Sequence, residues 1–153
     1  MSAAIDMADD GGQPLYSWYD VHAGARELVD QIKKSGATIT GIVAIPKGGL
    51  VLGTILAHAF CVPLHIGHAP EPWMPTSFLA VDDNSITGGS LSPFAHYGMP
   101  CAVLVRHPNA PGIHPFYFAE ESDEMYLFPW EAEGEQELRD VETIVAGETP
   151  TCR

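Results

Sequence analysis

The chain has 153 residues, of which 46% are hydrophobic and 18% charged, a balance typical of a globular protein with a sizeable core rather than a disordered one. Its 20 acidic and 7 basic residues give a formal charge of −13. This charge argues against general binding of nucleic acids or anionic membranes, which requires Lys and Arg to replace counterions, and no apolar run is long enough to span a membrane.

The two ends of the chain differ in composition from its middle. Residues 1–14 are small, acidic and glycine-containing, and they lack the basic patch and apolar core of a secretion signal, so we expect a flexible N-terminal tail. Residues 132–153 form an acidic C-terminal segment. We therefore expect a single domain over residues 15–131.

Helix and strand patterns alternate along this domain. In chain order, the apolar spacing predicts a helix at 16–35, a strand at 40–45, a helix at 50–60, strands at 62–66 and 78–81, a helix at 91–97 and a strand at 101–106. This alternation predicts an α/β fold, in which helices flank a parallel sheet. Ligands in such sheets bind beyond the carboxyl ends of the strands, so the turns after residues 45, 81 and 106 should share one edge.

The most informative stretch is 78–91. Its apolar strand ends on Asp82 and Asp83, and Thr87-Gly88-Gly89-Ser90 follow before the next predicted helix. A loop that leads into a helix presents unpaired backbone amides to a phosphate, and glycines allow a close approach. Paired acids suit sugar hydroxyls or a Mg²⁺ carried by the phosphates. The pattern predicts a ribose phosphate site, and the alternative is an ordinary turn rich in small polar residues.

This order of residues resembles the phosphoribosyl-diphosphate (PRPP) binding loop of type I phosphoribosyltransferases, which has an apolar strand, two acids, a short variable piece and a Thr-Gly-Gly turn. The turn Pro46-Lys47-Gly48-Gly49 resembles the diphosphate-binding turn of the same family, with Lys47 in the cationic place. Its alternative is a glycine turn with a solvated lysine. The likeness extends over about residues 16–131 and is greatest to the bacterial xanthine-guanine and hypoxanthine branch, which has a similar Pro129-Trp130-Glu131 ending.

The resemblance implies a role for each matching residue. Asp82, Asp83 and Lys47 would be catalytic, with Mg²⁺ reaching Asp82 and Asp83 through PRPP. The residues implied for PRPP binding are Lys47, Gly48, Gly49, Asp82, Asp83, Thr87, Gly88, Gly89 and Ser90. Those implied for base binding are Ile86, Arg106, Met125 and Tyr126, although simple core packing would equally explain Met125 and Tyr126, and a solvated strand end would explain Arg106.

Two departures from the family pattern bear on activity. Ile86 stands where many purine enzymes of the family carry an Asp near the base, and isoleucine neither accepts nor donates a proton. Residues 67–77 are shorter than the family's mobile loop, which implies a reduced hood. With Trp73, His65 and His68, this segment is either a small lid or a fixed, proline-braced surface turn. The two histidines lack a third ligand at convincing spacing for a metal.

These observations lead to one expected function and one alternative. We expect a phosphoribosyltransferase that moves ribose 5-phosphate from PRPP to a nucleobase, preferably a 6-oxopurine, and releases diphosphate with Mg²⁺. The alternative is a non-catalytic regulatory protein of the same fold that binds PRPP or a nucleotide. The resemblance implies a homodimer. Three widely spaced cysteines predict neither a disulfide framework nor a zinc site, and they favour a cytoplasmic protein with Cys61 and Cys101 buried.

Overall fold

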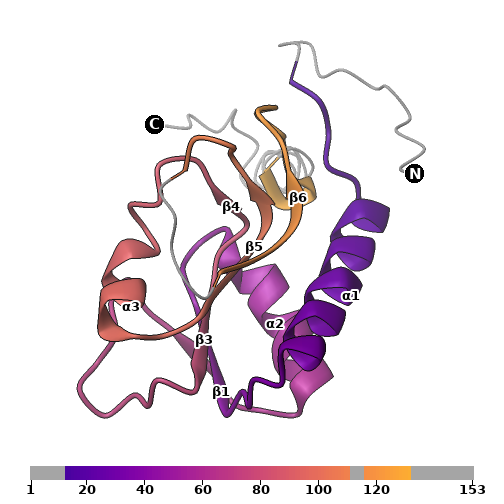
Figure 1. The fold of residues 1–153 in the computed structure, drawn as a ribbon. Helices are drawn as coiled ribbons and strands as arrows, with labels where there is room; N and C mark the ends of the chain where they lie inside the picture. Colours follow the sequence, from indigo (N-terminus) through magenta and orange to yellow (C-terminus); the bar gives the residue numbers. More distant parts are fainter. Residues whose placement is uncertain (1–12, 111–115, 132–153) are drawn as a thin grey trace, which may run out of the picture. The chain divides into compact units, whose positions relative to one another are not determined.

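The computed structural model describes residues 13–110 and 116–131, and the chain divides into two compact units (Figure 1). The described part of the first unit comprises residues 13–20 and 124–131. The described part of the second comprises residues 21–110 and 116–123.

The second unit contains a six-stranded sheet in which every strand pair is parallel. Its strands are β1 (Gly41–Ala44), β2 (Leu64–Ile66), β3 (Phe78–Val81), β4 (Asn84–Ser85), β5 (Cys101–Arg106) and β6 (Phe116–Glu121). The strands follow the order β2-β1-β3-β5, and both β4 and β6 also pair with β5. The predicted α/β fold with a parallel sheet flanked by helices is confirmed, and the strands predicted at 78–81 and 101–106 have the observed bounds.

Helices cover both faces of this sheet. Helix α3 (Ser92–Tyr97) lies on the opposite face from α2 (Gly49–Phe60) and from the long α1 (Trp18–Ser35) (Figure 1). Alternate residues of the buried strands supply the two cores, since successive side chains point to opposite faces. Val43 and Ala80 belong to a cluster that includes Leu91, which precedes α3, and Phe94 of α3 itself. On the other face α2 packs so closely on β1 that a Cβ on Gly53 would come within 2.7 Å of the Ala44 Cβ.

The sheet contains two strands that the sequence patterns did not predict, β4 and β6. Strand β4 follows β3 after only Asp82 and Asp83. Val81 pairs with Ala102, and Asn84 pairs with Val105, so β4 continues the β3 register along β5 after a two-residue interruption. A strand of two residues is too short to show alternation, which explains why it was missed.

The first unit is a small aromatic assembly. An isolated parallel bridge joins Leu15 to Leu127, with the Tyr16 amide donating to the Leu127 carbonyl at 2.9 Å. The rings of Phe128 and Trp130 stack at 5.1 Å. Ser17 and Asp20 form a reciprocal capping box at the start of α1, in which each side chain accepts the other's backbone amide.

Two further properties of the described residues concern cysteine and hydropathy. Cys101 is buried in β5, as predicted, but the burial predicted for Cys61 is wrong. Cys61 follows the last residue of α2 with a left-handed backbone (φ 54°), and this cap position places its side chain at the surface.

Within the described ranges no helix combines the length and the apolar character that crossing a membrane would need.

Candidate functional site

The carboxyl ends of β1, β3 and β5 meet at one edge of the sheet because the strands are parallel. The Ile45 amide donates to the Val81 carbonyl at 2.9 Å, which ties the end of β1 to the end of β3. The turns that follow these two strands therefore begin side by side. They carry the two motifs that the sequence singled out, Pro46–Gly49 and Asp82–Ser90.

A hollow of about 280 Å³ lies at this edge. Its lining consists of Asp82, Asn84, Ser85, Ile86, Thr87, Gly88, Gly89, Ser90 and Leu91. The lining thus includes the first predicted carboxylate, the isoleucine that replaces an acid, and the whole predicted phosphate loop. Asn84, Ser85 and Leu91 were not predicted as site residues, since they belong to the unrecognised strand β4 or follow the phosphate loop.

The predicted phosphate loop, Thr87–Ser90, is shaped largely by its own backbone. Gly88 has a positive φ of 76°, a conformation in which a side chain would be strained. The Gly89 amide donates to Thr87 Oγ1 at 3.3 Å, and the Ser92 amide donates to the Gly88 carbonyl at 2.9 Å. Helix α3 has six residues, so the loop backbone contributes more to this hollow than a helix dipole does.

The two adjacent carboxylates have different environments. Asp82 lines the hollow, whereas Asp83 is 7% exposed and is not part of the lining. Asp83 Oδ1 accepts the Asn84 amide at 2.8 Å, and its carbonyl accepts the Leu104 amide of β5 at 3.0 Å. The sequence predicted that both carboxylates contact the same ligand. Of the two, only Asp82 lines the hollow.

Asp83 faces the other turn of the edge. A Cβ added to Gly48 would collide with the Asp83 carboxylate, and one added to Gly49 would collide with the Val81 carbonyl oxygen. The turn Pro46–Gly49, whose Pro46–Lys47 peptide is cis, therefore packs directly against the end of β3. Glycine is required at both positions, because the Asp83 side chain fills the space beside Gly48 and the Val81 backbone fills the space beside Gly49. The packing of Gly48 against Asp83 thus joins the two motifs.

The pKa of Asp82 is strongly perturbed. Burial first, and then the negative charge of Asp83, raises the pKa of the Asp82 carboxyl from its usual 3.8 to about 8. Desolvation penalises the ionised form, and a nearby cation would compensate that penalty. Asp82 is therefore a carboxylate that a divalent ion can stabilise at the mouth of a hollow, although the described residues contain no cluster of three or more His, Cys, Asp or Glu suited to a metal.

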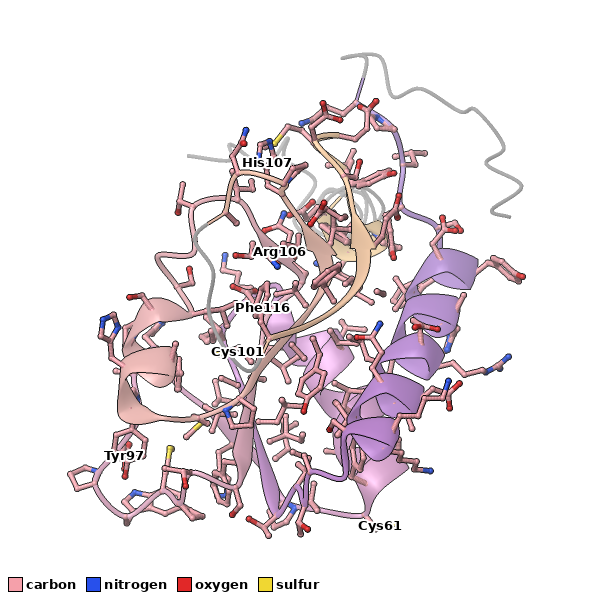
Figure 2. The ribbon with its side chains drawn as sticks, in the orientation of Figure 1. Cys61, Tyr97, Cys101, Arg106, His107 and Phe116 are labelled. Carbon is pink, nitrogen blue, oxygen red and sulfur yellow. The ribbon has the colours of Figure 1, made fainter. Side chains whose placement is uncertain are left out.

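The two predicted cations lie at the carboxyl ends of two different strands, β1 and β5. Lys47 is exposed on the turn after β1. Arg106 ends β5, and Phe116 of β6 lies near it (Figure 2). The Arg106 guanidinium lies 5.2 and 5.3 Å from the ring centroids of Phe116 and Phe118. These cation–π contacts hold the side chain in place. Its Nη2 donates a long hydrogen bond of 3.5 Å to the Ala110 carbonyl.

Two buried polar atoms beside the hollow have no hydrogen-bond partner. They are Arg106 Nε and Ser85 Oγ, and Ser85 and Arg106 are paired in the β4–β5 register. Buried polar groups are normally satisfied, and each exception costs about 1–3 kcal/mol. A ligand with an acceptor oxygen within hydrogen-bond distance of these two side chains would remove this cost.

The remaining base-site candidates belong to the first unit. Met125 is 49% exposed, and the Tyr126 ring meets the Tyr16 ring edge-on at 5.2 Å. Their part in base binding stays a prediction.

The segment 67–77 is a braced surface turn. The Tyr97 hydroxyl donates to the Met74 carbonyl at 2.6 Å, Met74 is buried, and the Trp73 indole donates to Glu71. Trp73 and His65 pack against Phe78, the first residue of β3. Since Asp82 follows the last residue of β3, this aromatic cluster lies at the opposite end of the strand from the hollow. The geometry favours the fixed turn over the small lid.

Of the comparisons with known proteins, the one with solved structures found similar chains. No protein-family model matches the chain. No curated protein matches it by sequence. A purine phosphoribosyltransferase from Pyrococcus horikoshii is 22% identical with a TM-score of 0.59, covering 75% of this chain and 91% of that one.

Two other solved structures overlap more of the chain. The Helicobacter pylori xanthine-guanine-hypoxanthine phosphoribosyltransferase is 17% identical with a TM-score of 0.67, covering 80% of this chain and 96% of that one. A hypothetical protein from Neisseria gonorrhoeae with bound ppGpp is 17% identical with a TM-score of 0.65, covering 88% of this chain and 96% of that one. At such identities the likeness concerns the backbone, and the chain therefore has the type I phosphoribosyltransferase fold.

Proposed function

We propose that the chain is a phosphoribosyltransferase that transfers ribose 5-phosphate from PRPP to a nucleobase, with a 6-oxopurine preferred. The observation that carries the proposal is the hollow at the carboxyl edge of the sheet, where Asp82 faces the Thr87–Ser90 loop. This combination suits a phosphorylated sugar, because the loop offers amides and hydroxyls to the phosphate and the carboxylate accepts hydrogen bonds from sugar hydroxyls.

In the proposed reaction the bond from ribose C1′ to the diphosphate oxygen breaks, and a bond from C1′ to a base nitrogen forms. Diphosphate leaves with the bonding electron pair, and the base nitrogen loses its proton to solvent. The chain's part is to position the two reactants and to stabilise the leaving charge. Lys47 and the amides near Gly48 and Gly49 would hold the diphosphate, and residues 87–90 would hold the 5′-phosphate.

The residues present fit Mg²⁺ carried by PRPP. Magnesium is usually held by one or two carboxylates together with substrate oxygens and water, and Asp82 offers one carboxylate whose raised pKa would fall on meeting a cation. When bound, the ion neutralises charge on the diphosphate. Asp83 supports this arrangement from behind, since it packs against Gly48 and thereby fixes the turn that carries Lys47.

The preference for a 6-oxopurine is supported by the unpartnered atoms of Ser85 and Arg106. Both are hydrogen-bond donors, and an exocyclic carbonyl oxygen is an acceptor. Ile86 lines the hollow and offers an apolar contact in place of an acid. Met125 and Tyr126 are the proposed stacking contacts. The free thiols of Cys61 and Cys101 suit a reducing compartment, so we place the activity in the cytoplasm.

The second candidate is a regulatory protein that binds PRPP or a nucleotide without turnover. Ile86 favours it, because the hollow lacks a proton-transfer group at that position. The Neisseria gonorrhoeae protein of similar fold holds ppGpp, which makes a guanine nucleotide with a diphosphate the natural ligand to test.

Two measurements test these candidates. The first is diphosphate release from PRPP and Mg²⁺ in the presence of hypoxanthine, guanine, xanthine, adenine, orotate or uracil. The enzyme should release diphosphate with at least one oxopurine. The second is calorimetric titration with PRPP, GMP and ppGpp. Binding without release supports the regulatory candidate, whereas absence of both binding and release overturns both.

A further inference from the structure

The Arg106 guanidinium is held in place, yet some of its hydrogen-bond donors are unused. Its charge lies 5.2 and 5.3 Å from the ring centroids of Phe116 and Phe118, and neither ring has an oxygen or nitrogen that accepts a hydrogen bond. Arg106 Nε is buried without a partner, and the bond from Nη2 to the Ala110 carbonyl is long, at 3.5 Å. An unsatisfied donor on a charged group is costly, so this arrangement favours a ligand.

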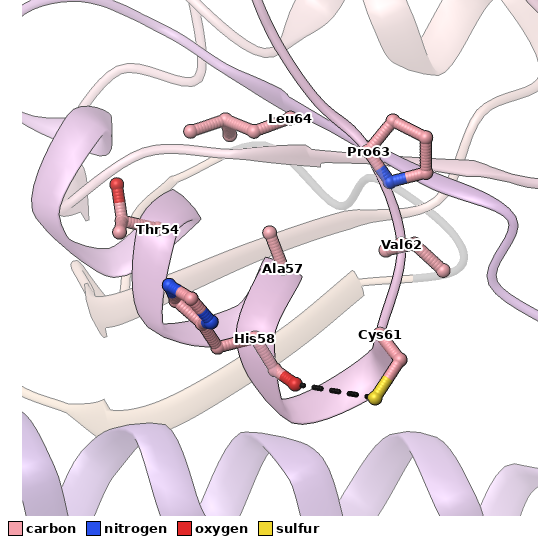
Figure 3. Close-up of a pocket in the computed structure, with 7 residues that line it drawn as sticks. All are labelled: Thr54, Ala57, His58, Cys61, Val62, Pro63 and Leu64. Carbon is pink, nitrogen blue, oxygen red and sulfur yellow. Dashed lines mark hydrogen bonds between the residues drawn. The ribbon is translucent and has the colours of Figure 1, made fainter.

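A second hollow of about 540 Å³, between the end of α2 and the start of β2, shows no such unsatisfied group (Figure 3). The Cys61 thiol in its lining donates to the His58 carbonyl at 3.7 Å. Among the described residues, the buried side-chain atoms without a partner belong to Ser85 and Arg106 instead. The demand for a ligand therefore lies at the β4–β5 pair.

The open donors of Arg106 share one edge of the guanidinium. Nε and Nη2 direct N–H groups to the same side in one plane, and this fork binds two acceptor atoms at once. In a purine with a 6-oxo group, the oxygen and ring nitrogen N7 are neighbouring acceptors on one edge. Arginine commonly contacts this pair of atoms when proteins recognise guanine in DNA.

The surroundings of the fork suit a flat ring. Ser85 lines the hollow beside Asp82, and it is paired with Arg106 in the β4–β5 register. Neighbouring strands lie about 4.8 Å apart, so one planar ligand can reach both side chains. Ile86 and Leu91 add apolar surface to the same lining. An aromatic ring with acceptors on one edge matches these donors and apolar contacts together.

We propose that Arg106 binds the purine through the 6-oxo oxygen and N7 together, while Ser85 donates to the same oxygen. This inference rests on the proposed function and names the edge by which the acceptor base is recognised. Ile86 exchanges no proton with a ligand, and a base whose N7 accepts a hydrogen bond from Arg106 requires no proton exchange there. N9 is then the imidazole nitrogen that remains for C1′. A 6-amino group is a donor that would face the donors of Arg106, so adenine is rejected.

The test is calorimetric titration of the full chain with three nucleotides, so that binding is measured without turnover. They are inosine monophosphate (IMP), 7-deaza-IMP, in which C–H replaces N7, and AMP, in which an amino group replaces the 6-oxo oxygen. IMP should bind the wild-type chain about tenfold or more tightly than either analogue. This comparison needs no variant.

Arg106→Lys keeps the charge but removes the fork. In this variant the affinity for IMP should fall, and the ratio of the IMP and 7-deaza-IMP affinities should approach one. Damage to the fold would weaken both nucleotides alike and leave the ratio unchanged. Arg26→Lys is the matched control, because Arg26 is exposed on α1, and it should preserve the wild-type ratio. Circular dichroism checks that each variant is folded.

Equal binding of IMP and 7-deaza-IMP by the wild-type chain would overturn the inference, as would a ratio that persists in Arg106→Lys. Tighter binding of orotidine monophosphate than of IMP would also overturn it, because the fork would then hold a carboxylate. Diphosphate release with any base would leave the proposed function standing in each of these cases. Absence of nucleotide binding together with absence of diphosphate release would instead overturn the proposed function itself.

Discussion

Asp82 couples the stability of the fold to pH. In the unfolded chain this carboxyl loses its proton near pH 3.8, but in the folded chain it keeps the proton until about pH 8. Between these values the folded state binds more protons than the unfolded state, so the free energy of unfolding falls as pH rises, and above pH 8 the penalty stays constant.

Asp82→Asn should therefore be more stable than the wild-type chain, with a difference that grows from about pH 4 to pH 8. The same change should weaken binding of PRPP with Mg²⁺, because the amide carries no negative charge. Urea unfolding at several pH values measures the first effect and calorimetry the second. Asp30→Asn on exposed α1 is the control. A pH-independent difference would contradict the raised pKa.

Gly48 and Asp83 depend on each other sterically. Gly48→Ala should lower the free energy of unfolding by about 1–3 kcal/mol, because its Cβ would overlap the Asp83 carboxylate. The penalty should shrink when Asp83 is replaced by Ala, which gives a double-mutant cycle with a coupling energy of about 0.5–3 kcal/mol. Gly67→Ala is the control, since its Cβ would meet nothing closer than 3.6 Å. If the two substitutions lower the free energy of unfolding by additive amounts, Gly48 and Asp83 are not in contact.

Replacing Ser85 distinguishes a role in the stability of the fold from a role in ligand binding. Its hydroxyl is buried without a partner, so Ser85→Ala should leave the free energy of unfolding unchanged or raise it slightly. Affinity for the nucleobase or nucleotide should fall by a factor of about 2–10, while PRPP affinity stays constant. Unfolding curves and two titrations make the comparison. Unchanged affinity for every purine would remove Ser85 from the proposed base site.

At the scale of elements, the turn 67–77 is tied to the amino end of β3 rather than to the hollow. Trp73→Ala should lower the free energy of unfolding by about 0.5–1.5 kcal/mol, since it removes ring contacts with His65 and Phe78. It should leave the KM for PRPP unchanged. A lid would behave differently, with a clear rise in KM and little loss of stability.

The interruption between β3 and β4 is the element that makes the hollow. If β3 ran on without a break, Asp82 would take an ordinary place in the sheet. Instead the Asp83 carbonyl accepts the amides of both Leu104 and Val105, at 3.0 and 3.2 Å, and pairing then resumes at Asn84. The register with β5 thus fixes where the predicted phosphate loop begins.

At the scale of the whole molecule, the charge of −13 opposes the approach of an anionic substrate. Added salt screens this repulsion, because the Debye length falls to about 8 Å at physiological ionic strength. Raising KCl from about 20 to 200 mM at constant free Mg²⁺ should therefore lower the KM for PRPP or leave it level. Steady-state kinetics measure this. A steep rise in KM would indicate a cation-rich phosphate site.

The sequence by itself determined the parallel sheet and the two turns at its edge, because apolar runs such as 78–81 and 101–106 are buried on both faces and glycine turns follow two of the strands. These are local patterns. The tertiary structure alone decided that Asp82 opens onto the hollow while Asp83 packs behind Gly48, and that Ser85 lies beside Arg106. Adjacent residues point to different sides of an irregular strand, and register between distant strands is set by packing, which no single stretch of sequence records.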